Sequence, residues 1–86
     1  MSQKSKLFLK ILSGNSDNNI NFSELVSFLI SLGFELRIKG DHYIFSSSEM
    51  DEIINLQPLN NKAKPYQLKQ VRNLIIKYKL FKEENE

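Results

Sequence analysis

The chain contains a single histidine, His42, within the stretch KGDHYIF (39–45). It follows Gly40 and Asp41, a pair typical of a tight turn, and it precedes residues typical of a β-strand. Imidazole is the side chain that gains and loses a proton between about pH 5 and 8, so a histidine at an accessible strand end can transfer protons. A lone histidine can also be only a structural ring. The place beside a turn glycine, where a large ligand can reach the ring, favours the chemical interpretation.

Basic residues dominate the last third of the chain. Residues 53–82 contain no Asp or Glu, but they contain seven basic side chains: Lys62, Lys64, Lys69, Arg72, Lys77, Lys79 and Lys82. The whole chain has a net charge of +2, so the remaining residues carry −5. A basic block on one structural element is expected of a protein that binds a polyanion. A solvated helix face rich in lysine has the same composition, and charge alone does not separate the two interpretations.

A histidine and several cations are sufficient for one phosphodiester reaction, the cleavage of RNA. The nucleophile is the 2′-hydroxyl of the RNA itself, so the protein needs only to transfer protons and to stabilise negative charge. In such a reaction His42 would be the general acid or base, and four lysines would bind RNA phosphates: Lys39, Lys62, Lys64 and Lys69. Asp41 is a candidate for orienting the ring, although adjacent strand residues point to opposite faces.

Composition excludes several other classes of protein. The chain has no cysteine, so it can form neither a disulfide nor a zinc site with thiolate ligands. One imidazole with scattered carboxylates lacks the spacing of a metal site, and we expect no metal and no cofactor. No apolar run approaches the roughly 20 residues of a membrane span. Lys10 interrupts the apolar N-terminal segment, which we expect to be a helix and not an export signal, in a cytoplasmic protein.

Hydrophobic spacing predicts the elements that must position these side chains. At 86 residues the chain has the length of one domain. A period near 3.6 predicts three helices, over residues 4–12, 22–32 and 65–80. Alternation with period two predicts three strands, over residues 34–39, 42–45 and 53–57. Short connections make neighbouring strands antiparallel, and such a sheet needs helices over one face. We therefore predict an α+β fold, a three-stranded antiparallel meander with helices on one face.

Turn and capping residues mark where these elements begin and end. Asn21 is suited to cap the second helix, and Gly33 is suited to end it in the left-handed conformation. Gly40 and Asp41 form the turn between the first two strands, and Pro65 has the fixed φ of a first helical residue. We divide the chain into an N-terminal helix and loop (1–19), a main domain (20–80) and a polar C-terminal tail (81–86).

The ordered elements of residues 20–80 resemble the HicA toxins, the YcfA-type mRNA interferases. The matching pieces are, in order, Gly33-Phe34, Gly40-Asp41-His42-Tyr43-Ile44-Phe45, Pro58 and Lys64-Pro65-Tyr66-Gln67-Leu68. The resemblance implies a fold like that of double-stranded-RNA-binding domains, an endoribonuclease that cleaves mRNA and stops translation, and inhibition by a HicB-type antitoxin. It also implies that His42 is catalytic. The chain differs at two points: Asp41 stands where serine is common, and Asn60 lies near the position of a second histidine.

Two other classes of function remain open from the sequence. A domain of the same fold could dock on RNA and cut nothing, or its basic face could meet an acidic protein. His42 separates cleavage from simple binding, because a module that only binds RNA has no need of an imidazole at this position. We also expect the oligomeric state to be set by the complex with the antitoxin.

Overall fold

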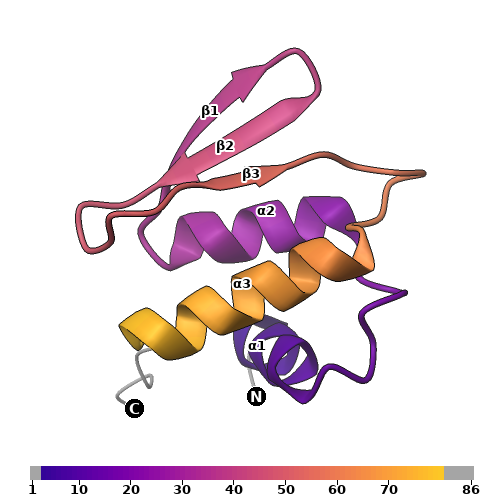
Figure 1. Cartoon of the computed structure of the whole chain (residues 1–86). Helices are drawn as coiled ribbons and strands as arrows, with labels where there is room; N and C mark the ends of the chain where they lie inside the picture. Colours follow the sequence, from indigo (N-terminus) through magenta and orange to yellow (C-terminus); the bar gives the residue numbers. More distant parts are fainter. Residues whose placement is uncertain (1–2, 81–86) are drawn as a thin grey trace.

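The computed structural model describes residues 3–80 and is an α+β fold built on one three-stranded antiparallel sheet (Figure 1). Its elements are, in order, α1 (Gln3–Ser13), α2 (Phe22–Ser31), β1 (Glu35–Lys39), β2 (His42–Ser46), β3 (Ile54–Leu56) and α3 (Pro65–Tyr78). The sheet order is β1-β2-β3, so each strand pairs with the next one along the chain. The predicted α+β class and three-strand meander are confirmed. The predicted tail, residues 81–86, lies outside the described residues.

The helices lie in two layers on one face of the sheet. Figure 1 shows α2 and α3 beneath the sheet, and α1 on the side of these helices that is away from it. α1 contacts both of the other helices. The hydrophobic core runs through all of these layers, and its most buried members include Ile11, Leu25, Leu29, Phe45, Leu56, Leu68 and Val71. Because Ile11 and its neighbour Phe8 are buried in this core, α1 packs as part of the same body as the main domain.

The β1–β2 hairpin determines which side chains share a face of the sheet. Gly40, the first central residue of the two-residue turn, has a φ of 63°. This is the conformation of a type II′ hairpin turn, and glycine adopts it without strain. Lys39 and His42 are therefore paired across the turn, and Arg37 pairs with Ile44. Because side chains alternate along a strand, these four residues lie on one face, the face without helices.

The predicted signals at the two ends of α2 are confirmed. The side-chain oxygen Oδ1 of Asn21 accepts the backbone N–H of Glu24 at 3.1 Å, which caps the helix. Ile20 and Leu25 are both buried, as expected for a hydrophobic contact that fixes the direction in which the chain enters the helix. Gly33 ends the helix with a φ of 103°. The chain can then turn sharply into β1, because glycine has no Cβ to oppose a positive φ.

The last helix ends two residues before the predicted boundary. Lys79 takes a left-handed φ of 52°, which stops the helix at Tyr78. The backbone N–H of Leu80 then donates to the carbonyl of Ile75 at 3.1 Å, which closes the last turn. Leu80 is still buried in the core although it lies outside the helix. The predicted boundary was too late because Leu80 continues the apolar spacing of the helix although it lies after the end of α3.

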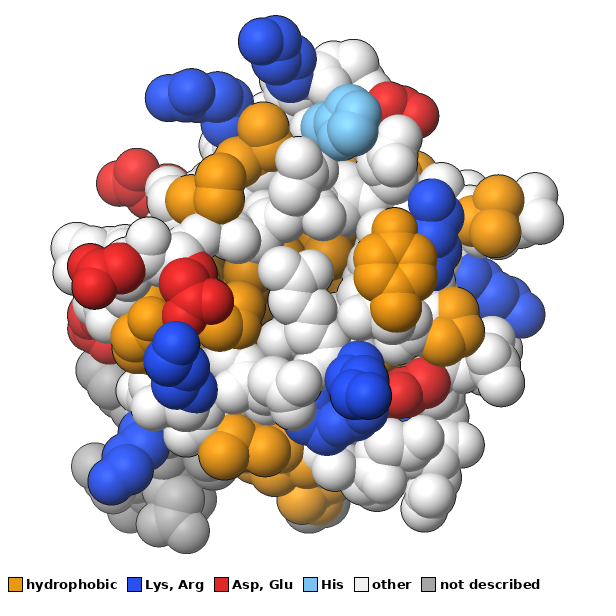
Figure 2. Space-filling view, in the orientation of Figure 1, with side chains coloured by type: hydrophobic (Ala, Val, Ile, Leu, Met, Phe, Trp, Pro, Cys, Tyr) orange, Lys and Arg blue, Asp and Glu red, His pale blue; other side chains and the backbone are white. Residues whose placement is uncertain are grey.

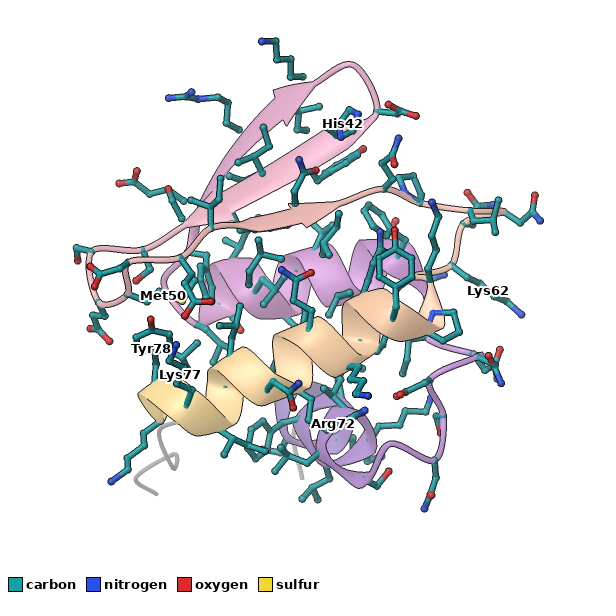
Figure 3. The ribbon with its side chains drawn as sticks, in the orientation of Figure 1. His42, Met50, Lys62, Arg72, Lys77 and Tyr78 are labelled. Carbon is teal, nitrogen blue, oxygen red and sulfur yellow. The ribbon has the colours of Figure 1, made fainter. Side chains whose placement is uncertain are left out.

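The segment between β2 and β3 holds the sheet to α3. Most of its residues are polar, but Met50 is 8% exposed and belongs to the core. Glu52 accepts hydrogen bonds from Lys77 Nζ at 2.6 Å and from the Tyr78 hydroxyl at 2.8 Å (Figure 3). The bond from Lys77, followed by that from Tyr78, holds the pKa of Glu52 below its ordinary value of 4.5. The same contact with Glu52 raises the pKa of both donors.

A half-buried ion pair links α1 to α3. Nη1 of Arg72 donates to the carbonyl of Ile11 at 3.0 Å and to the two carboxylate oxygens of Asp17 at 3.1 and 3.2 Å. The Arg72 and Asp17 side chains are only 18% and 19% exposed. Arg72 thus satisfies a carbonyl in the last turn of α1 and neutralises the carboxylate in the loop that follows. Its charge is used inside the fold, although composition alone groups Arg72 with the basic block.

Candidate functional site

His42 lies on the open face of the sheet, near the turn of the β1–β2 hairpin (Figure 3). Tyr43 and Phe45 point the other way, toward the helices: Phe45 is buried, and the Tyr43 ring packs edge-on against Phe22 with centroids 4.9 Å apart. His42 and Ile44 therefore share the opposite face. The His42 side chain is 48% exposed, so a large ligand can reach its ring.

A side chain from β3 contacts one nitrogen of the His42 ring. Nδ1 of His42 lies 3.1 Å from Oδ1 of Asn55. In the β2–β3 register Asn55 is the partner of Ile44, which places it on the same face as His42 and diagonally across from it. Diagonal neighbours on adjacent strands are within reach of long or ring-shaped side chains. The ring is thus held from the β3 side, and its Nε2 edge is left for other contacts.

The carboxylate of Asp41 lies beside the second ring nitrogen. Its Oδ1 is 3.8 Å from Nε2 of His42, which is too long for a hydrogen bond but close enough for an electrostatic contact. Its Oδ2 accepts a hydrogen bond from Nε2 of Gln57 at 3.2 Å. Strand alternation would send Asp41 to the face opposite His42, but Asp41 lies in the turn, where alternation does not apply. We name these four side chains the His42 cluster: Asp41, His42, Asn55 and Gln57.

Two cations share the open face with the His42 cluster. Lys39 is the cross-strand partner of His42, and Arg37 is that of Ile44. Directly opposed residues have Cβ atoms about 4.5–5.5 Å apart, so Lys39 is within reach of any phosphate that His42 meets. Figure 2 shows the histidine with basic side chains on one side of it and an acidic side chain on the other. Hairpin register thus brings Lys39 to the histidine, as the predicted RNA site requires.

Lys62 lies on a different surface. It follows a tight turn in which Asn60 and Asn61 have left-handed φ values of 54° and 65°. The backbone of Leu59 and Lys62 is hydrogen-bonded in both directions across this turn, at 2.9 and 3.0 Å. The N–H of Phe22 donates to the carbonyl of Asn61 at 2.9 Å, which holds the turn against the start of α2. Figure 3 shows the Lys62 side chain directed away from His42.

Of the other two predicted lysines, Lys64 lies just before α3 and Lys69 lies on it. Lys64 is the capping residue before Pro65, its N–H donates to the side chain of Gln67 at 3.1 Å, and its Nζ lies 6.0 Å from the centroid of the Tyr66 ring. Lys69 is exposed on the helix itself. Within residues 3–80, the hydrogen bonds and the ion contact of the His42 cluster involve neither Lys64 nor Lys69. We name the three lysines that lie just before α3 or on it the α3 lysines: Lys62, Lys64 and Lys69.

Two further findings concern residues 3–80 alone. Within this range, no three His, Asp or Glu side chains come together in a way that could hold a metal ion. None of the helices in the same range has both the length and the hydropathy needed to cross a membrane.

Comparison with known proteins gave no match of any kind. No family model matches the chain, and the comparisons with curated proteins and with solved structures found no match.

Sequence reasoning missed Asn55 and Gln57 as members of the site. The alternation of INLQ, with Ile54 and Leu56 buried, is itself a signal that Asn55 and Gln57 lie on the open face. The register of β3 against β2 is what brings Asn55 to His42, and no local pattern in the sequence specifies that register.

Proposed function

We propose that the protein is an endoribonuclease that cleaves mRNA without a metal ion, with His42 as general acid or base. One observation supports this most directly. An accessible imidazole is held by Asn55 on the open face of the sheet, with the cation of Lys39 directly across the strand pair. A ring with only a packing role would be expected on the helix side, where its neighbours Tyr43 and Phe45 lie.

The reaction requires few protein groups. The 2′-hydroxyl of the RNA loses its proton, its oxygen attacks the adjacent phosphorus, and the bond from phosphorus to the 5′-oxygen breaks as that oxygen gains a proton. The products are a 2′,3′-cyclic phosphate and a 5′-hydroxyl. His42 takes the first proton as a neutral imidazole or supplies the second as an imidazolium. Lys39 and Arg37 stabilise the negative charge that develops on the phosphate oxygens.

The wider identity of the protein is part of the same proposal. The order α2-β1-β2-β3-α3, with both helices beneath one face, supports a fold like that of double-stranded-RNA-binding domains. Together with the residues shared with the HicA toxins, it supports a toxin of that kind, which cuts mRNA in the cytoplasm and arrests translation. A HicB-type antitoxin would inhibit it by covering the open face, without a change of fold, and the complex would set the oligomeric state.

Inducible expression in a bacterial host tests this proposal. We expect the wild type to arrest growth and fragment mRNA, and we expect His42→Ala to do neither. Asn73→Ala is the matched control, because it truncates an exposed polar side chain on α3, and it should behave as the wild type. Equal toxicity of the wild type and His42→Ala, or growth arrest with intact mRNA, would contradict the catalytic assignment.

The position of the α3 lysines favours a second candidate, a module that binds RNA and does not cut it. Double-stranded-RNA modules contact phosphates and 2′-hydroxyls by shape, and cations around a helix N-terminus suit such contacts. Lys62 and Lys64 flank the start of α3 in this way. A module of this kind would keep its RNA affinity in His42→Ala and would leave RNA intact in both proteins. Affinity and RNA integrity measured on the same samples distinguish it from the ribonuclease.

A further inference from the structure

The two nitrogens of the His42 ring face different kinds of acceptor at different distances. Nδ1 lies 3.1 Å from the amide oxygen of Asn55, which is hydrogen-bond length. Nε2 lies 3.8 Å from a carboxylate oxygen of Asp41, which is beyond it. With the amide oxygen of Asn55 turned toward the ring, as the structure places it, Nδ1 is the donor of this contact and carries the hydrogen. A neutral imidazole has only one N–H, and Nε2 is therefore the nitrogen with the free lone pair.

We propose that Asn55 is a positioning residue that holds His42 in the Nδ1–H tautomer, so that Nε2 is the nitrogen that exchanges protons with RNA. The tautomer depends on the geometry alone, whereas its catalytic consequence rests on the proposed function. Neutral histidine in water favours the opposite tautomer, with the hydrogen on Nε2. The hydrogen bond made by one ring nitrogen determines the state of the other, and here Asn55 supplies that bond.

The carboxylate of Asp41 favours a proton on Nε2, but at 3.8 Å it makes no hydrogen bond, whereas Nδ1 is at hydrogen-bond length from Asn55. The charged groups that face the ring are Asp41 from the turn and Lys39 and Arg37 from β1. Gln57 donates to the outer oxygen of Asp41, which keeps the carboxylate beside Nε2. When Nε2 takes the proton of the 2′-hydroxyl, the ring becomes positive and Asp41 faces the new charge. The single histidine of this chain thereby has a hydrogen-bond partner at Nδ1 and a charge partner at Nε2.

Nitrogen-15 NMR of the imidazole tests the tautomer, and the presence of only one histidine makes the spectrum simple. At alkaline pH, where imidazole side chains are neutral, we expect the wild type to show a protonated Nδ1 and an unprotonated Nε2. In Asn55→Leu we expect the two nitrogens to exchange these states. Asn55→Asp keeps an acceptor oxygen at the same position and should retain the tautomer of the wild type. Asn73→Leu is the control for placing leucine at an exposed asparagine, and it should change nothing.

Cleavage kinetics of the same four proteins test the catalytic consequence. We expect Asn55→Leu to lower the rate at saturating RNA by about tenfold or more, which is part of the 10²–10⁴-fold that general acid–base catalysis contributes. KM should be unchanged, because Asn55 acts through His42, and Asn55→Asp should restore most of the rate. A structural role would instead lower the stability of the protein and leave the rate per folded molecule unchanged.

Three results would overturn parts of the inference, and they can be distinguished. A wild-type ring protonated at Nε2 overturns the tautomer, whatever the protein does to RNA. A reversed tautomer in Asn55→Leu with an unchanged rate overturns the positioning role. A wild type that does not cleave RNA overturns the proposed function and the catalytic role of Asn55 with it, and the NMR spectra still decide the tautomer.

Discussion

The His42 cluster and the Arg72–Asp17 contact are both polar networks between parts of the chain that are distant in sequence, but they differ in exposure. The Arg72 and Asp17 side chains are 18% and 19% exposed, and one guanidinium nitrogen of Arg72 makes three hydrogen bonds. The His42 and Asp41 side chains are 48% and 71% exposed, and their contact is longer than a hydrogen bond.

The difference in exposure separates a contact that stabilises the fold from one that contributes little to it. A shielded charge that loses its partner leaves the other charge unpaired, so the Arg72 contact must contribute to the stability of the fold. Exposed polar contacts contribute little to stability because water competes for them. The His42 cluster is therefore not needed to hold the hairpin together. Its effect is to keep one accessible ring in a fixed orientation, which is a requirement for a catalytic group.

Arg72→Met should lower the stability of the protein, whereas His42→Ala should lower its activity and leave its stability nearly unchanged. This is the largest contrast in stability that we predict. Arg72→Met leaves Asp17 and the Ile11 carbonyl without their donor and should lower the free energy of unfolding by about 1–3 kcal/mol. His42→Ala should stay within about 0.5 kcal/mol of the wild type, as is usual for exposed sites. Urea unfolding monitored by circular dichroism measures both. A loss in His42→Ala as large as that in Arg72→Met would show that the His42 cluster is structural.

The two sets of cations should affect different steps. Replacing Arg37 and Lys39 together by Gln should reduce the rate of cleavage at saturating RNA by about tenfold, because both lie on the face of His42. Replacing Lys62 and Lys64 together by Gln should weaken RNA binding instead. The slope of log affinity against log salt concentration should flatten by about 1.4–1.8, as expected for two lost phosphate contacts. If the slope flattens only when Arg37 and Lys39 are replaced, the assignment of the two surfaces is reversed. If it is unchanged when Lys62 and Lys64 are replaced, these two lysines do not contact phosphates.

The smallest predicted effect concerns the contact of Glu52 with Lys77 and Tyr78. The folded-state pKa of Glu52 is lowered below 4.5, so its contribution to stability is present above the unfolded value and is lost as the pH falls through the lowered pKa. The pKa of Lys77 is raised above 10.5, so its contribution is present below that value and is lost only at higher pH.

Denaturation midpoints of the wild type and Glu52→Gln should therefore differ slightly at pH 7 and converge at strongly acidic pH. Glu49→Gln, an exposed carboxylate of the same segment, is the matched control and should show no such convergence. A difference between wild type and Glu52→Gln that persists unchanged into acid would exclude the titration of Glu52 as its cause.

Local signals explain why most of the fold was predictable from the sequence. The cap at Asn21, the left-handed Gly33 and the turn glycine Gly40 each act within a few residues, and the structure shows all three as expected. Met50 was not predicted to be buried, because one apolar residue in a polar segment has no period. The role of Arg72 was not predictable from composition either, because its partner Asp17 is 55 residues away in the sequence.

In the candidate site, too, the contacts set by local signals could be predicted from the sequence and the others could not. His42 and Lys39 are paired by a two-residue turn, so the sequence could predict that they lie together. Asn55 reaches His42 only through the register of β3, and Asp41 does so only because it is a turn residue. The contact of Asn55 depends on strand register and that of Asp41 on the conformation of the turn. The hydrophobic period of the sequence specifies neither of them.

Cleavage of a labelled RNA by the purified protein, in the presence of a chelator, tests the central claim most directly. We predict that the wild type produces a 2′,3′-cyclic phosphate and a 5′-hydroxyl, and that a 2′-deoxy nucleotide at the observed cut blocks the reaction. His42→Ala, with unchanged stability, should be slower by about a hundredfold or more. Cleavage by His42→Ala at the rate of the wild type would contradict the assignment of His42 as the catalytic residue.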